Sequence, residues 1–165
     1  MSWRGARVAV VGTGIVGAAC AERLAAEGFA VTLVGDEPPG HGATAAGMGH
    51  VVVMDDSEAQ LALTRYGREL WTALAPELPS AAEYVACGTL WVAADSEERG
   101  EAERKHARLK AAGVRSELVR GEAVRRLEPQ LRPGLAGGLL VAEDAVVYPP
   151  GVAAWLVARA TGDAD

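Results

Sequence analysis

Residues 7–36 read RVAVVGTGIVGAACAERLAAEGFAVTLVGD and decide the fold of this chain. The stretch starts with an apolar run at 8–11, which is short and β-branched enough to predict a buried strand. A segment rich in Ala, Leu and Glu follows and predicts a helix to about Glu27, ended by Gly28. Residues 30–34 predict a second apolar strand. The sequence therefore predicts an α/β fold that opens with a Rossmann-like βαβ unit.

Three glycines lie between the first strand and the helix with the spacing G-x-G-x-x-G. Gly12 allows a tight turn, Gly14 lets the backbone approach a pyrophosphate, and Gly17 allows close packing of the helix. The start of the helix offers N–H groups and the positive end of its dipole to phosphates. We expect the whole turn to bind a dinucleotide: Gly12, Thr13, Gly14, Ile15, Val16 and Gly17.

The same segment has a second interpretation as a secretory signal peptide. Arg4 and Arg7 precede a run of small residues that reaches Cys20, near a possible cleavage site. Two features oppose this interpretation: the glycines fall where a phosphate turn needs them, and the pattern continues into a second strand. Dinucleotide binding is therefore favoured, with Cys20 as a small buried side chain of the helix.

Composition limits the classes of function. The chain has 165 residues, which suggests one domain or slightly more, and half of them are hydrophobic. Its net charge of −6 argues against nucleic acid or an anionic membrane as the main partner. No apolar run approaches the roughly 20 residues that a membrane span needs. Two cysteines give neither a disulfide framework nor metal-ligand spacing, so we expect no metal and a cytoplasmic location.

The end of the second strand is where an acidic residue should meet the ribose of the adenosine. Asp36 lies 24 residues after Gly12, and Glu37 follows it. Asp36 is therefore the predicted ribose ligand, with a solvated acid of the loop as the alternative.

Residues 38–49, PPGHGATAAGMG, carry no side chain larger than His or Met. Such a segment is either a flexible linker or a loop whose backbone lies against a flat or anionic group. Thr44 can present a hydroxyl to phosphate or ribityl oxygens. An apolar run at 51–54, expected to be a strand, follows at once and favours the loop.

Several motifs follow one another in a recognisable order. After the glycine turn come GATAAGM at 42–48, CGTLWVA at 87–93, LEP at 127–129, a Gly-Gly pair before Asp144, and VYPP at 147–150. This series resembles the D-amino-acid oxidase/glycine oxidase family of FAD-dependent oxidoreductases. Within it, the resemblance points to the branch of D-hydroxyproline dehydrogenase, the flavin subunit of hydrogen cyanide synthase and sarcosine oxidase, and it covers nearly the whole chain.

The resemblance implies FAD as the cofactor and assigns further residues to its site. Many flavoproteins of this type carry Glu at the position of Gly35, so the acid at Asp36 is displaced by one residue. Thr44 occupies the place where some relatives bond a His covalently to the flavin. His50 is a weak candidate for a residue near the flavin or substrate, the alternative being a polar residue that starts a strand. The loop expected to pass along the flavin comprises Thr44, Ala45, Ala46, Gly47 and Met48.

The resemblance also implies an activity and a domain plan. The activity is oxidation of a small amine or a (D-)amino or imino acid in amino-acid catabolism, by hydride transfer to the flavin. Residues 1–80 would form the FAD-binding domain, residues 81–146 part of an α+β substrate-binding domain, and residues 147–165 a helix that returns to the FAD-binding domain.

Helices and strands outside the βαβ unit are predicted from local patterns. Ser57 is expected to cap a helix that reaches about residue 75, and Ser96 a charged helix at 97–112. Further helices are expected at 121–127 and 149–160, and strands at 84–85, 90–93, 114–119 and 139–141. The adjacent Asp55 and Asp56 are expected to be solvated charges before a helix. A stripe in the first of these helices is expected to face the core: Leu61, Leu63, Tyr66, Leu70, Trp71 and Leu74.

Two other functions stay open. The family's substrate domain continues beyond the pattern seen here, so the chain is expected to be an N-terminal part, apparently truncated. It would then be a non-catalytic half or subunit that needs another polypeptide as a hetero-oligomeric or C-terminal partner. The weaker alternative is an NAD(P)-dependent dehydrogenase that uses the same glycine turn, which the Gly/Ala loop disfavours.

Overall fold

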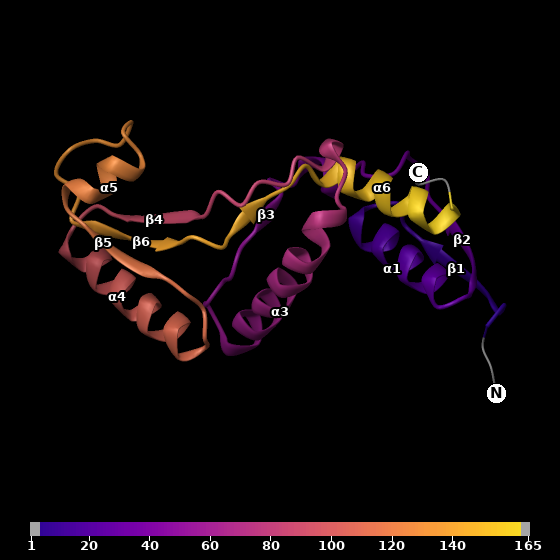
Figure 1. The fold of residues 1–165 in the computed structure, drawn as a ribbon, viewed down its shortest axis with the longest axis horizontal. Coiled ribbons are helices and arrows are strands. Elements are labelled where there is room, and N and C mark those ends of the chain that lie inside the picture. The colour runs from indigo at the N-terminus through magenta and orange to yellow at the C-terminus, as the bar shows by residue number, and fades with distance from the viewer. Residues whose placement is uncertain (1–3, 163–165) are drawn as a thin grey trace. The chain divides into compact units, whose positions relative to one another are not determined.

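The structure is a computed structural model that describes residues 4–162. Its contacts divide the chain into two compact units (Figure 1). The first unit comprises Met1–His50, Leu74–Tyr84 and Val146–Asp165, and the second comprises Val51–Ala73 and Val85–Ala145. Residues 51–73 therefore belong to the second unit, whereas the expected first domain extended to residue 80. The expected boundaries for the complete fold stay a prediction.

The first unit is built on the predicted strand, helix and strand. Strand β1 (Arg7–Val11) is followed by helix α1 (Ile15–Ala26) and strand β2 (Ala30–Val34). The two strands pair in parallel, with Arg7 opposite Ala30 and Val11 opposite Val34. A parallel pair needs a crossover connection, which α1 provides. The predicted α/β class and βαβ unit are confirmed.

Helix α6 (Pro149–Thr161) packs along α1, as Figure 1 shows for the yellow and indigo helices. Proline stands at the start of α6, and Gly162 ends it in the left-handed region at φ 79°. The buried side chains of both helices are mainly small, so the helices can approach closely. They are Ala18, Ala21, Val152, Ala153 and Leu156. The predicted C-terminal helix is confirmed.

Shorter elements complete the first unit and lie at two of the four points where the chain passes from one unit to the other. Helix α2 (Ala43–Ala46) lies in the Gly/Ala loop, and the 3₁₀ turns η1 (Ala75–Glu77) and η2 (Ser80–Ala82) follow later. Strand β3 (His50–Val51) pairs with β7 (Ala145–Val146). The apolar run at 51–54 was expected to be a longer strand, and this was wrong. The N–H of Val53 donates to a side chain, Oδ1 of Asp144, at 3.4 Å.

The second unit contains an antiparallel sheet in the order β4-β6-β5. Its strands are β4 (Thr89–Ala93), β5 (Glu117–Arg120) and β6 (Gly137–Val141), with helices α4 (Ser96–Ala111) and α5 (Glu122–Leu127) beside them. Residues 84–85, expected to be a strand, contain only an isolated bridge at Val85. The core is formed by Val53, Ala102, Leu109, Val114, Leu139 and Val141.

Helix α3 (Glu58–Leu74) forms as predicted, and the hydroxyl of Ser57 accepts a hydrogen bond from the N–H of Gln60 at 3.2 Å. The expected core-facing stripe was wrong, because three of its members are more than half exposed: Leu63, Tyr66 and Leu70. The side chain that α3 buries is Arg68, which is 8% exposed. Apolar spacing identifies a side of a helix, but it does not say whether another element covers that side.

The cap of α4 also differs from the prediction. The carboxylate of Asp95 accepts hydrogen bonds from the N–H groups of Glu97 at 2.9 Å and Glu98 at 3.0 Å. Asp95 is therefore the N-cap, and Ser96 is already the first residue of the helix. An aspartate suits this place because its charge also favours the positive end of the helix.

Replacing this cap should cost measurable stability. Asp95→Ala is expected to lower the free energy of unfolding by about 1 kcal/mol, because two N–H groups lose their acceptor. Ser96→Ala, the matched control, should change it by less than about 0.5 kcal/mol. Urea denaturation followed by circular dichroism measures both. Equal losses for the two variants would contradict the assignment of the cap.

Candidate cofactor-binding site

The glycine turn begins where β1 ends. Gly12 has φ 112°, a conformation that residues with a side chain rarely adopt, and its N–H donates to the carbonyl of Val34 at 2.8 Å. This bond ties the turn to the neighbouring strand. Gly14 is the N-cap of α1 in an extended conformation, with φ −70° and ψ 175°. The turn therefore leads directly from the end of a strand into the start of a helix.

Gly17 lies in the first turn of α1 and faces the glycine turn itself. A Cβ placed on it would overlap the carbonyl oxygen of Gly12 and lie 2.9 Å from the carbonyl carbon. These are backbone atoms that no rotamer change can move away. Gly17 therefore allows the start of α1 to lie as close to the backbone of Gly12 as the structure shows.

The start of α1 has hydrogen-bond donors to offer. The N–H of Ile15 donates to Oγ1 of Thr44 at 3.0 Å, and the first bond within the helix runs from the N–H of Ala18 to the carbonyl of Gly14 at 2.9 Å. Within residues 4–162, no group accepts a hydrogen bond from the N–H of Val16 or Gly17. Two donors at the positive end of a 12-residue helix are suited to bind an anion.

Thr44 joins the Gly/Ala loop to this turn. A Cβ at Gly14 would lie 2.9 Å from Oγ1 of Thr44, so the second glycine of the motif leaves room for the threonine hydroxyl. Gly42, with φ 62° and ψ −132°, is the N-cap of α2. The four residues after Thr44 are exposed: Ala45, Ala46, Gly47 and Met48. The structure thus brings the predicted loop to the predicted turn, although 29 residues separate Thr44 from Ile15.

The loop after β2 is also held on the turn, by Thr13. Its hydroxyl donates to the carbonyl of Glu37 at 3.0 Å, and its carbonyl accepts from the N–H of Gly40 at 2.9 Å. Asp36, the predicted ribose ligand, is exposed in this loop. The sequence predicted Thr13 only as a member of the turn. The absence of a side chain at Gly35 was the signal that could have revealed the contacts of Thr13 with this loop.

Other predicted or excluded residues lie elsewhere. His50 is exposed at the start of β3. Cys20 was expected to be buried, but it is exposed, because α1 turns Ala18 and Ala21 inward instead.

In the described part of the chain, no three His, Cys, Asp or Glu side chains gather as metal ligands would. Within the same residues, no helix combines the length and apolar character that a membrane crossing requires.

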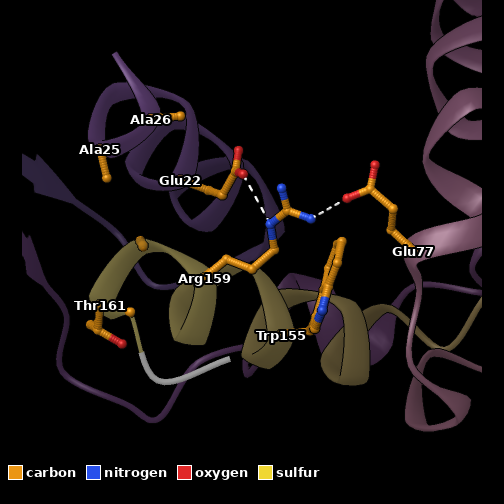
Figure 2. Close-up of a pocket in the computed structure, with 9 residues that line it drawn as sticks. Glu22, Ala25, Ala26, Glu77, Trp155, Arg159 and Thr161 are labelled. Carbon is orange, nitrogen blue, oxygen red and sulfur yellow. Dashed lines mark hydrogen bonds and ion pairs between the residues drawn. The ribbon is translucent and has the colours of Figure 1, made fainter. Parts of the chain in front are cut away.

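A surface pocket of about 700 Å³ lies between the C-terminal turns of α1 and α6 (Figure 2). The guanidinium of Arg159 bridges Glu22 at 3.1 Å and Glu77 at 2.5 Å, and it lies 4.8 Å from the ring centroid of Trp155. The hydrogen bond with Glu77 and the charges of both carboxylates raise the pKa of Arg159, against a smaller opposing effect of desolvation. The arginine is already paired and the helix ends here carry carbonyls, so this pocket does not suit the phosphates of a dinucleotide.

Comparison with known proteins identifies the family of the chain. Residues 7–163 match the family described as FAD dependent oxidoreductase (DAO). The bifunctional protein MnmC of tRNA 5-methylaminomethyl-2-thiouridine biosynthesis from Cupriavidus necator is 31% identical over 166 residues. That match covers 96% of this chain and 25% of MnmC.

Two solved structures resemble this fold closely. Glycine oxidase from Geobacillus kaustophilus gives a TM-score of 0.85 at 27% identity, over 96% of this chain and 45% of that chain. Iminodiacetate oxidase (IdaA) from Chelativorans sp. BNC1 gives a TM-score of 0.78 at 26% identity, with the same two shares. The chain thus spans less than half the length of these relatives.

The family match extends over nearly all of the chain. The chain therefore belongs to the DAO family of FAD-dependent oxidoreductases, whose cofactor is FAD.

Proposed function

We propose that the first unit binds FAD across the glycine turn. The observation that carries this proposal is the pair of N–H groups of Val16 and Gly17, which have no acceptor among residues 4–162. They would hold the pyrophosphate, which the helix dipole also favours. Gly12 supports the fit, since a Cβ added there would meet nothing within 4 Å. The space above the turn is open to a ligand.

The other proposed contacts follow from the two loops on either side of this turn. Asp36 would accept a hydrogen bond from the adenosine ribose. Thr44 is held at the start of α1 and would place its small, exposed neighbours against the flavin: Ala45, Ala46, Gly47 and Met48. These residues leave the backbone accessible to a flat ring. A place for His50 near the flavin stays a prediction.

The reaction we propose is the oxidation of a small amine or of an amino or imino acid. When bound, FAD supplies the hydride acceptor, and the protein positions the substrate and excludes water. The relatives glycine oxidase and iminodiacetate oxidase support this substrate class. Membership in an FAD-dependent family favours it over the NAD(P)-dependent dehydrogenase. A cytoplasmic location stays a prediction.

Thr44 offers a direct test of the proposed site. Thr44→Val removes the acceptor of the Ile15 N–H and is expected to weaken FAD binding about tenfold, since a lost hydrogen bond of this kind is worth about 1 kcal/mol or more. Thr44→Ser keeps the hydroxyl and should bind nearly as the wild type does. Quenching of flavin fluorescence on titration measures the dissociation constants.

The control is Thr72→Val, a threonine of α3 whose hydroxyl donates to the carbonyl of Arg68 and which lies in the second unit. It should leave FAD binding unchanged. Equal affinity of Thr44→Val and the wild type would contradict the proposed place of Thr44.

A second candidate is a non-catalytic part that needs further polypeptide. Parallel sheets are normally covered on both faces, yet alternate residues of β1 and β2 are exposed, with Val11 83% and Val34 48% exposed. Helix α3 also exposes Leu63, Tyr66 and Leu70. These surfaces would be completed by more polypeptide, within the same chain or from another one.

Anaerobic mixing of the FAD-loaded chain with glycine, sarcosine or a D-amino acid separates the two candidates. Bleaching of the flavin absorbance would show that the chain alone is catalytic. Bound flavin that no amine bleaches, together with dye binding to exposed apolar surface, would favour the second candidate. A monomer with a cooperative thermal transition and no dye binding would count against it.

A further inference from the structure

Thr13 makes two contacts that the glycine motif does not explain. Its hydroxyl donates to the carbonyl of Glu37 at 3.0 Å, and its carbonyl accepts from the N–H of Gly40 at 2.9 Å. One residue of the phosphate turn therefore holds both ends of the segment 37–40. A loop fixed at two points presents its side chains in a defined place, which a solvated loop would not do.

Gly35 is the counterpart of Thr13. A Cβ at position 35 would lie 2.6 Å from Oγ1 and 3.0 Å from Cβ of Thr13, and closer still to its methyl group. Gly35 is not among the glycines with positive φ, so its backbone conformation does not demand glycine. Glycine is required at position 35 because the side chain of Thr13 lies so close. Threonine branches at Cβ, so rotation of its side chain would bring another atom into the same space.

This packing affects the acidic residue that meets the ribose. Position 35 directly follows β2, and no side chain fits there while Thr13 stays in place. The first acid available after the strand is Asp36, which is exposed. Glu37 follows it, and two adjacent carboxylates would repel a phosphate on the ribose. The loop is thus suited to free ribose hydroxyls.

We propose that Thr13 and Gly35 form a matched pair that fixes the loop 35–40 on the phosphate turn and assigns the ribose contact to Asp36. Thr13 is then a positioning residue for the ribose contact that is proposed for Asp36. The assignment of the ribose contact rests on the proposed binding of FAD by this turn. The packing of Thr13 against Gly35 is independent of FAD binding.

Thermal unfolding without ligand tests the packing. Gly35→Ala is expected to lower the melting temperature by about 3 to 10 °C, because the added carbon overpacks against Thr13. In the Thr13→Ala background the two closest atoms are gone, and the same change should cost much less. Gly67→Ala is the control, since a Cβ in that part of α3 meets nothing within 4 Å. It should raise the melting temperature slightly or leave it unchanged.

Calorimetric titration with ADP and 2′-deoxy-ADP tests the positioning. Asp36→Asn should weaken ADP binding about tenfold and leave 2′-deoxy-ADP binding unchanged, because only the ribose hydroxyl contact is lost. Thr13→Ala should reduce the preference for ADP over 2′-deoxy-ADP, and Thr13→Ser, which keeps the hydroxyl, should restore it. Glu37→Gln is the control and should keep the preference.

The outcomes separate the two levels of the proposal. Equal losses for Gly35→Ala in both backgrounds, or no loss at all, would overturn the matched pair. A Thr13→Ala variant that keeps the wild-type preference for ADP would overturn the positioning role. A folded wild-type chain that binds neither nucleotide would overturn the ribose assignment together with the proposed FAD site, while the melting temperatures still decide the pair.

Discussion

Gly17→Ala is expected to lower the free energy of unfolding by about 3 kcal/mol and to reduce FAD binding at least tenfold. The added carbon would overlap the carbonyl oxygen of Gly12. Because this oxygen belongs to the backbone, the clash can be relieved only if the helix moves away from the turn. That movement would displace the N–H groups proposed for the pyrophosphate. Stability and affinity should therefore fall together.

The matched control is Gly100→Ala in α4. A Cβ there would contact only the guanidinium of Arg104, at an ordinary distance of 3.7 Å. This change should stabilise the protein by up to about 1 kcal/mol, since alanine favours a helix. Urea denaturation and flavin titration measure both variants. A Gly17→Ala protein with the stability and affinity of the wild type would show that the turn is built differently.

Asp144→Ala is expected to cost about 3 kcal/mol of stability in the second unit. Asp144 is 2% exposed, and its Oδ1 accepts from Nη1 of Arg68 at 3.2 Å and from the N–H of Val53 at 3.4 Å. Removing the carboxylate leaves a buried guanidinium whose one remaining side-chain partner among residues 4–162 is Glu143, at 3.1 Å. It also leaves the N–H of Val53 without this acceptor. Both effects are costly in a buried place.

Two further variants make this prediction specific. Asp144→Asn keeps an acceptor and the size of the side chain, so it should cost less than Asp144→Ala. Arg68→Met should cost less in the Asp144→Ala background than alone, because no unpaired buried charge remains. Asp56→Ala, at an exposed aspartate, is the control and should change stability by less than about 0.5 kcal/mol. Strict additivity of the two changes would contradict the pairing.

The βαβ unit was predictable because local patterns determine it. The strand at 8–11, the helix start after Gly14 and the second strand each follow from a few neighbouring residues. The C-terminal helix was predictable for the same reason, since its first proline and its final Gly162 mark both ends. The glycine spacing also predicted the turn between β1 and α1, because a phosphate turn requires these residues in this order, and the cofactor site at that turn stays a prediction.

The contacts that hold distant segments together were not predictable from the sequence. Arg68 lies on a helix whose spacing suggested an apolar stripe, and its partner Asp144 is 76 residues away. Asp55 was expected to be solvated, yet it is 6% exposed and forms ion pairs with Lys105 and Arg108. Residue type and local spacing describe one element at a time, whereas burial depends on what packs against it.

The measurement that tests the central claim most directly is a visible absorption spectrum of the purified chain after incubation with FAD and gel filtration. Binding across the glycine turn predicts a flavin spectrum that elutes with the wild-type protein and is strongly reduced for Gly17→Ala and Thr44→Val. A folded wild-type chain that elutes colourless after saturation with FAD would contradict the claim that this unit holds the cofactor by itself.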